Sequence, residues 1–238
     1  MNKIYGSCKE AVADIRDGAS IMFGGFGGPP AFPQDLLFAL LEQGAKELTI
    51  IGSAPAMSDA TRKRRWGEYT DCSILVEHKR IKKVIAAYPF YTMLSDLGAL
   101  ERAYLAGEVE VEVVPHGTLV ERIRAGGAGI GGFYTPTAVG TLLAEGKETR
   151  VFGGREYLLE LPLNADFALI HAHKADTLGN LVYRRTARSY NHPMATAAKV
   201  TIVEAENVVT PGELEPDFIH TPAVYVDRIV QVGRRAWK

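Results

Sequence analysis

The chain has 238 residues, of which 47% are hydrophobic and 23% are charged, and its formal net charge is −1 at pH 7. A chain of this length buries a core that needs no disulfide or metal staples, so we expect a globular protein. The balance of 27 basic and 28 acidic residues gives no broad basic field, which argues against nucleic acid as a partner. A run of about eighteen apolar residues is absent, which excludes a membrane-spanning helix.

The first residues and the cysteines predict a cytoplasmic protein. Residues 1–10 contain Lys3, Lys9 and Glu10 and no apolar stretch, so they do not resemble a secretory signal. Cys8 and Cys72 lie in separate segments, which indicates reduced thiols rather than a disulfide framework.

The first part of the chain predicts a helix followed by a strand, a glycine loop and a second helix. Ser7 and Glu10 form a capping-box pattern before a helix that we expect to end near residues 17–18. Residues 21–23 are a short apolar run, and glycines and prolines fill most of residues 24–30. Leucines then recur at helical spacing until Gly44, which predicts the end of the second helix.

The rest of the chain continues this alternation and then becomes rich in strands. We expect strands over residues 48–51, 83–88 and 109–114 and helices over residues 97–105 and 119–124. From about residue 151, short apolar runs separated by turn residues replace the helices. The pattern predicts an α/β fold with an open, mostly parallel sheet flanked by helices and a β-rich C-terminal extension, in a single domain over residues 1–238.

The glycine loop after the first predicted strand is a candidate substrate-binding segment. Gly24, Gly25, Phe26 and Gly27 stand where parallel α/β sheets place their ligands, and a bare backbone can approach an anion or acyl group closely. The spacing matches neither the dinucleotide fingerprint nor the P-loop, which argues against a nicotinamide or ATP site. A tight turn with no ligand explains the same glycines equally well.

A second glycine segment is also a candidate substrate-binding segment. Five glycines lie between Arg124 and Phe133, and each ordered glycine costs roughly 0.5–1 kcal/mol relative to alanine. Close approach to a ligand, or to a partner's active-site loop, explains this density better than a flexible connector does. We therefore select Gly127, Ala128, Gly129 and Ile130, whose N–H groups can serve as oxyanion donors.

Charged residues and histidines give weaker signals. Arg80 precedes an apolar strand, and we expect it to place a cation at the edge of the pocket, whereas the basic cluster at residues 62–66 is more typical of a solvated surface. His171 and His173 share one face of a predicted strand, where a role in the core or an interface is favoured over a metal pair. The nucleophile elbow of hydrolases is absent.

Several linked motifs together resemble the alpha subunit of family I CoA-transferases, the 3-oxoacid type. The similarity spans nearly the whole chain in order. The motifs are residues 17–26, 107–112, 117–130, 133–137, 166–169, 174–176, 179–180 and 219–222.

The resemblance implies a transferase that moves CoA between two carboxylic acids in a ping-pong cycle, through a glutamyl-CoA thioester. In that family the nucleophilic glutamate lies in the beta portion, in a Ser-Glu-Asn-Gly motif, and this motif is absent here. The resemblance therefore implies no catalytic residue and no metal site in this chain. It implies a beta-subunit partner in a heterodimer or α2β2 assembly, acyl-CoA and small carboxylic acids as substrates, and no permanently bound cofactor.

Two other functions remain open, and two departures from the family pattern bear on the substrate. The alternatives are a self-sufficient homodimer that uses Glu77 or another carboxylate, and a ligand-binding module related to sugar-phosphate isomerases.

The first glycine loop is one residue longer than the family pattern, and Arg80 stands where the family commonly has glutamine. An arginine there can pair with carboxylates, which predicts an acid substrate with an additional anionic group. An Arg80 side chain that points to solvent, with the role of the amide lost or moved, is an equally good alternative.

Overall fold

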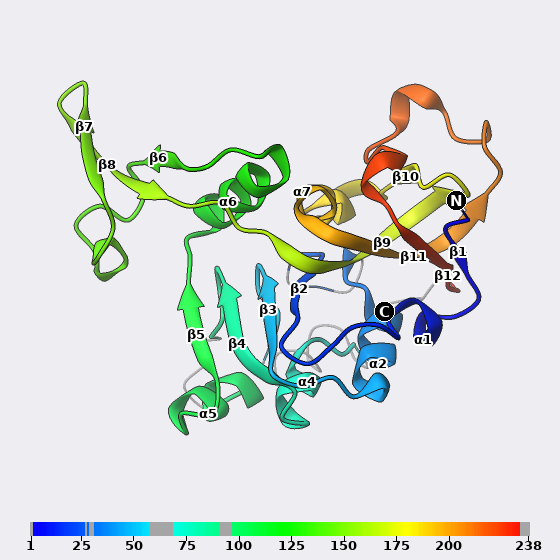
Figure 1. The fold of residues 1–238 in the computed structure, drawn as a ribbon, viewed down its shortest axis with the longest axis horizontal. Helices are drawn as coiled ribbons and strands as arrows, with labels where there is room; N and C mark the ends of the chain where they lie inside the picture. The colour runs from blue at the N-terminus through cyan, green and yellow to red at the C-terminus, as the bar shows by residue number, and fades with distance from the viewer. Residues whose placement is uncertain (1, 27, 29–30, 58–68, 91–96, 234–238) are drawn as a thin grey trace.

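The computed structural model describes residues 2–26, 28, 31–57, 69–90 and 97–233, shown as a ribbon in Figure 1. The strands within these residues are β1 (Ile4–Tyr5), β2 (Ser20–Phe23), β3 (Leu48–Gly52), β4 (Ile81–Ala86), β5 (Glu110–Val113), β6 (Phe133–Thr135), β7 (Thr149–Phe152), β8 (Arg155–Glu160), β9 (Ala165–Asp176), β10 (Leu181–Val182), β11 (Ala198–Val209) and β12 (Arg228–Gln231). The α-helices are α1 (Cys8–Ala11), α2 (Gln34–Gln43), α4 (Ser73–Glu77), α5 (Ala99–Leu105), α6 (His116–Ala128) and α7 (Asn191–Ala197). Four short 3₁₀ turns, η2 (Leu142–Ala144), η3 (Arg185–Arg188), η4 (Pro216–Phe218) and η5 (Ala223–Tyr225), complete these elements.

A mostly parallel sheet forms the centre of the described structure. Its strands follow the order β1-β12-β11-β9-β2-β3-β4-β5, and β10, which pairs with β9, is the one antiparallel strand described in this sheet. The predicted α/β class and the open, mostly parallel sheet flanked by helices are therefore confirmed. In Figure 1 the heads of β3, β4 and β5 point up toward α6.

Two hydrophobic cores lie on the two faces of this sheet. Alternate residues of each strand enter opposite cores, so Ile21 and Phe23 pack on one face and Met22 packs on the other. The first core includes residues of α1, α2, α4 and α5, and the second includes residues of α6 and α7. Burial on both faces explains why the strands read as continuous apolar runs rather than alternating patterns.

The β-rich C-terminal part extends the main sheet. The strands β9 and β11 have 12 residues each and pair in parallel, and β9 also pairs with β2. Asp166 helps to set this register, because its carboxylate accepts hydrogen bonds from the backbone N–H and the hydroxyl of Ser20 at 2.9 and 2.8 Å. The predicted late extension of the sheet is thus confirmed.

A small antiparallel sheet, which we call the arm, was not predicted. It has the order β6-β8-β7 and projects from the main body beside α6 (Figure 1). The strand β7 is exposed along its whole length, and Val151 and Phe152 keep 65% and 44% of their surface in solvent.

The first helix is shorter than predicted. The capping residue is confirmed, because the Ser7 hydroxyl accepts a hydrogen bond from the Glu10 N–H at 3.2 Å. The helix ends at Ala11, where the backbone changes to i→i+3 hydrogen bonds such as that from Ile15 to Val12. Among the described residues, no helix is long and apolar enough to cross a membrane.

Candidate functional site

The first glycine loop lies where the strand order reverses. From β2 the sheet continues to β3, β4 and β5 on one side, whereas β9 and the later strands lie on the other side. Ligands of open α/β sheets bind at such a point, beyond the carboxyl ends of the strands. Gly24, Gly25 and Phe26 follow the last residue of β2 and occupy this position, while Gly27 lies outside the described residues.

An aromatic and hydroxyl cluster forms around Phe26. The Phe26 side chain is 59% exposed, yet its ring centroid lies 5.1 Å from that of His116 and 5.9 Å from that of Tyr190. The Tyr190 hydroxyl donates a hydrogen bond to the His116 carbonyl oxygen at 3.1 Å, and Ser53 Oγ lies 3.4 Å from His116 Nδ1. Ser53 follows β3 and His116 begins α6 after β5, so the carboxyl ends of several strands supply the cluster.

Burial sets the protonation states in this cluster. It lowers the pKa of His116 below its usual value and raises the pKa of Tyr190 above its usual value. Near neutral pH, His116 is therefore uncharged and Tyr190 keeps its proton. The cluster presents neutral hydrogen-bonding groups and an aromatic surface.

The backbone of the loop adds hydrogen-bond donors. Among the described residues, neither the Gly25 N–H nor the Phe26 N–H has a hydrogen-bond partner, whereas the Gly24 N–H binds the Leu169 carbonyl oxygen at 2.9 Å. Free N–H groups beside an exposed aromatic ring can stabilise an oxygen atom that gains negative charge.

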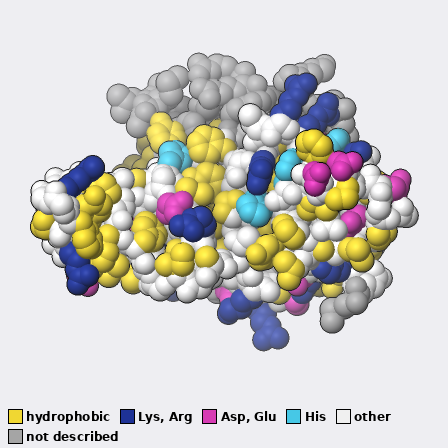
Figure 2. Space-filling model, turned by 90° about the horizontal axis from the view of Figure 1, so that it is seen from above, with side chains coloured by type: hydrophobic (Ala, Val, Ile, Leu, Met, Phe, Trp, Pro, Cys, Tyr) yellow, Lys and Arg dark blue, Asp and Glu magenta, His cyan; other side chains and the backbone are white. Residues whose placement is uncertain are grey.

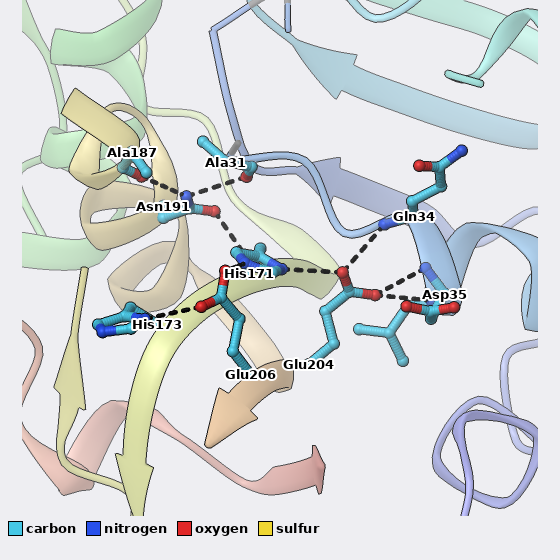
Figure 3. Close-up of polar contacts among 10 residues, drawn as sticks. Ala31, Gln34, Asp35, His171, His173, Ala187, Asn191, Glu204 and Glu206 are labelled. Carbon is cyan, nitrogen blue, oxygen red and sulfur yellow. Dashed lines mark hydrogen bonds and ion pairs between the residues drawn. The ribbon is translucent and has the colours of Figure 1, made fainter. Parts of the chain in front are cut away.

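Asn191 fixes the loop to the elements around it (Figure 3). Its side-chain amide donates to the carbonyl oxygens of Ala31 at 3.1 Å and Ala187 at 2.8 Å, and its Oδ1 accepts from the His171 N–H at 3.3 Å. A Cβ on Gly24 would lie 1.7 Å from Asn191 Oδ1. The glycine at position 24 is therefore required because the Asn191 side chain passes against the backbone there.

Glu204 fixes the helix that follows the loop (Figure 3). Its buried carboxylate accepts hydrogen bonds at 2.8–3.1 Å from the first N–H groups of α2, those of Gln34, Asp35 and Leu36. A carboxylate at this place satisfies N–H groups that have no partner within the helix, and it complements the helix dipole. Asn191 and Glu204 thus anchor the described ends of the segment between β2 and α2.

The histidine pair on β9 binds glutamates. His171 Nδ1 lies 2.9 Å from a Glu204 oxygen, and His173 Nδ1 lies 2.7 Å from a Glu206 oxygen (Figure 3). Burial lowers the pKa of His171, but Glu204 and Glu206 raise it by more, so the net pKa is raised. Across the described part of the chain, no group of three or more His, Cys, Asp or Glu side chains has the arrangement of a metal site.

A cavity of about 340 Å³ lies beside the first loop. Phe26, Gly28 and Ala31 line one side, and Thr186, Ala187 and Ser189 line the other. Of the predicted loop residues Gly24, Gly25 and Phe26, only Phe26 lines this space, which a small ligand can enter.

The structure corrects the prediction of a second glycine loop. Gly126, Gly127 and Ala128 form the last turn of α6, and Gly129 ends the helix with a left-handed φ of 69°. A Cβ on Gly126 would lie 2.5 Å from the Leu163 carbonyl oxygen, and one on Gly127 would lie 2.2 Å from Thr196 Oγ1. These two glycines are thus required for close packing of α6, while Ile130 follows the helix and is 38% exposed.

The structure also corrects the expected position of Arg80. This residue immediately precedes β4, so it lies at the amino edge of the sheet, opposite the glycine loop. Its guanidinium donates a hydrogen bond at 3.0 Å to the carbonyl oxygen of Gly44, the residue that ends α2. Arg80 therefore closes a helix end, and the argument for an additional anionic group on the substrate loses its basis. The basic cluster at residues 62–66 lies outside the described residues.

Sequence reasoning missed Ser53, His116, Tyr190 and Asn191 as site residues. The position of His116, just after a strand and at the start of a helix, is a signal that places it at the carboxyl edge. Tyr190 and Asn191 give no such signal, because only the folded chain brings them to Phe26 and Ala31.

The profile of the family described as "Coenzyme A transferase" matches residues 5–232. The chain belongs to the coenzyme A transferase family. It is 48% identical over 230 residues to the A subunit of the probable succinyl-CoA:3-ketoacid coenzyme A transferase of Bacillus subtilis, covering 97% of this chain and 90% of the relative. It is 46% identical to the A subunit of 3-oxoadipate CoA-transferase of Pseudomonas putida, covering 99% of this chain and 96% of that relative.

A solved structure with a different named activity has a similar fold. The crystal structure of a variant of the decarboxylase AibA/AibB superposes with a TM-score of 0.77 and 27% sequence identity, covering 98% of this chain and 84% of that chain. The predicted family resemblance is confirmed, and the chain is an alpha-type subunit of a CoA-transferase.

Proposed function

We propose that this chain forms one wall of the active site of a two-subunit CoA-transferase, and that a beta subunit supplies the nucleophilic carboxylate. The observation that carries the proposal is the match along 97% of the chain to a relative that is named as the A subunit of such an enzyme. Its substrates are an acyl-CoA and a 3-oxo acid or related carboxylic acid, the classes that the names of the relatives contain.

The reaction needs two transfers through the partner's carboxylate. The carboxylate attacks the acyl-CoA carbonyl and releases the CoA thiolate, and the thiolate then attacks the enzyme side of the mixed anhydride. The first acid leaves, and a thioester joins the enzyme to CoA. The second acid reverses these steps, so the thioester free energy is kept and no ATP or permanently bound cofactor is needed.

This chain's own residues stabilise and shield the reacting groups. The free N–H groups of Gly25 and Phe26 are donors for an oxygen that becomes negative when the carbonyl is attacked. The rings of Phe26, His116 and Tyr190 form an uncharged aromatic surface that, covered by the beta subunit, excludes the water that would otherwise hydrolyse the anhydride and the thioester.

Within the described residues, neither Cys8 nor Cys72 takes part in a disulfide bond, which supports a cytoplasmic location.

A transfer assay on defined samples tests this proposal. This chain by itself, the candidate beta chain by itself and the co-expressed pair are each given succinyl-CoA with acetoacetate or 3-oxoadipate, and formation of the new thioester is followed. We expect transfer from the pair only. Transfer by this chain without a partner would contradict the proposal and would favour a carboxylate in this chain, such as Glu77 at the end of α4.

A further inference from the structure

A groove of about 700 Å³ lies between α6 and the stretch of chain from η3 to α7. Val120, Arg124, Gly127 and Ala128 form the α6 side. The opposite side is lined by Thr186, Arg188, Ser189, His192, Pro193 and Thr196, and Tyr225 also lines the groove. On the face shown in Figure 2, basic and histidine side chains lie among acidic and hydrophobic ones.

The groove contains one positive charge, that of Arg188, that no described residue pairs with. Among the described residues, Arg188 has no hydrogen-bond or ion-pair partner. Its charge, after burial, contributes to lowering the pKa of the neighbouring His192, whose Nδ1 lies 3.0 Å from Thr221 Oγ1. Arg124 adds a second guanidinium, which pairs with Glu121 at 2.7 Å on the exposed face of α6.

Ser189 is the second unusual feature. Its hydroxyl oxygen is buried and has no hydrogen-bond partner within the described residues, and its φ is 33°, a left-handed value. An unpaired buried hydroxyl and a strained backbone are both unfavourable, and such residues concentrate at binding sites. A ligand oxygen in the groove would supply the missing partner.

The groove adjoins the cavity at the first glycine loop. Thr186 and Ser189 line both spaces, so a ligand that extends past these two residues reaches from the groove to Phe26. CoA has this extended form, because its pantetheine arm separates the reacting sulfur atom from the phosphates.

We propose that the groove binds the phosphate-bearing end of CoA, with Arg188 as its main contact and Ser189 and His192 as further hydrogen-bonding groups. This inference rests on the proposed function for the identity of the ligand. It makes this chain, and not only its beta partner, a contributor to nucleotide binding.

The test compares Arg188→Gln with Arg184→Gln in the complex with the beta subunit. Arg184 is exposed, lies in the same segment and does not line the groove, so its substitution removes the same charge without the proposed contact. Titration calorimetry with CoA is the direct readout. We expect Arg188→Gln to weaken CoA binding about tenfold or more, as for loss of a charge-assisted contact, and Arg184→Gln to leave it nearly unchanged.

A substrate without phosphates separates a contact from a structural effect. The KM for succinyl-pantetheine should be the same in Arg188→Gln and in the wild type, while the KM for succinyl-CoA rises. Equal losses with both substrates, equal losses in both variants, or loss of the assembled complex by native mass would overturn the inference. If the complex binds CoA but transfers nothing, the proposed function fails, and the titration still decides the groove.

Discussion

The glycine-rich segments that begin at Gly24 and at Gly126 have similar compositions, yet one is a loop and the other is mostly the end of a helix. Both contain glycines that are required by a close neighbour, Asn191 in the first and Leu163 or Thr196 in the second. The neighbours differ in kind. Asn191 holds an open loop beside a cavity, whereas Leu163 and Thr196 pack against a regular helix. A glycine-rich segment therefore indicates that another group packs closely against its backbone, but it does not indicate whether that group is a ligand, a loop or a packed helix.

The largest expected effect of a single substitution is at Gly24. Alanine there would meet Asn191 Oδ1 at 1.7 Å, so we expect Gly24→Ala to lower the free energy of unfolding by about 3 kcal/mol and to abolish most transfer. Urea denaturation and the transfer assay measure both effects.

A double substitution sharpens this prediction. Asn191→Ala removes the clash together with the hydrogen bonds to Ala31 and Ala187. The double variant Gly24→Ala/Asn191→Ala should therefore be more stable than the sum of the two single changes by about 1 kcal/mol or more. Simple additivity would show that the two side chains do not meet.

In the second segment a smaller loss of stability is expected. Gly126→Ala places a Cβ 2.5 Å from the Leu163 carbonyl oxygen, which costs roughly 1–3 kcal/mol and is partly offset by the better helix propensity of alanine. Gly131→Ala is the matched control, because nothing lies within 4 Å of its Cβ position. Equal unfolding free energies for the two variants would show that α6 does not pack as described.

The stability contributed by the His171–Glu204 pair beside the first loop should depend on pH. The glutamates raise the folded-state pKa of His171 above its unfolded value, so its stabilisation is fully present below about pH 6.5 and is lost as the pH rises through the folded-state pKa. The stability difference between wild type and His171→Gln should therefore decrease from pH 6 to pH 9, as followed by urea denaturation. A difference that is constant or grows over this range would contradict the charged pair with Glu204.

The smallest expected effect is at Arg80. Arg80→Gln removes one hydrogen bond to Gly44 at the edge away from the loop, which costs about 1 kcal/mol of stability. The ratio of kcat/KM for monocarboxylic and dicarboxylic acceptors should stay the same. A changed ratio would show that Arg80 does contribute to substrate binding.

Much of the fold was predictable because local signals and long-range packing agree. The unit of β2, glycine loop and α2 was predicted from an apolar run, glycines and leucines at helical spacing, and Gly44 ends α2 in the left-handed conformation. The first helix was predicted too long, since Val12 and Ile15 suit a helical stripe but are buried beyond the helix end. The arm was not predicted, and one reason is that its strand β7 has four residues that are all exposed and so carries no apolar periodicity.

The site was predicted only in part because its parts come from distant segments. Gly24, Gly25 and Phe26 followed from the rule that ligands bind beyond strand ends. Tyr190 and Asn191 are more than 150 residues away from that loop, and no local pattern relates them to it. The same rule places Arg80 away from the ligands, because a residue just before a parallel strand lies at the amino edge of the sheet. The resemblance, in which glutamine stands at this position, favoured the pocket instead.

The most direct test of the central claim is to locate the covalent intermediate. The complex of this chain with its beta subunit is incubated with acyl-CoA and reduced with borohydride, which converts a glutamyl-CoA thioester to an alcohol, and peptides of both chains are then analysed by mass spectrometry. The account predicts a single reduced glutamate in the beta subunit, with none in this chain. A reduced glutamate or aspartate in this chain would show that it carries the nucleophile, and would contradict its role as one wall of a shared site.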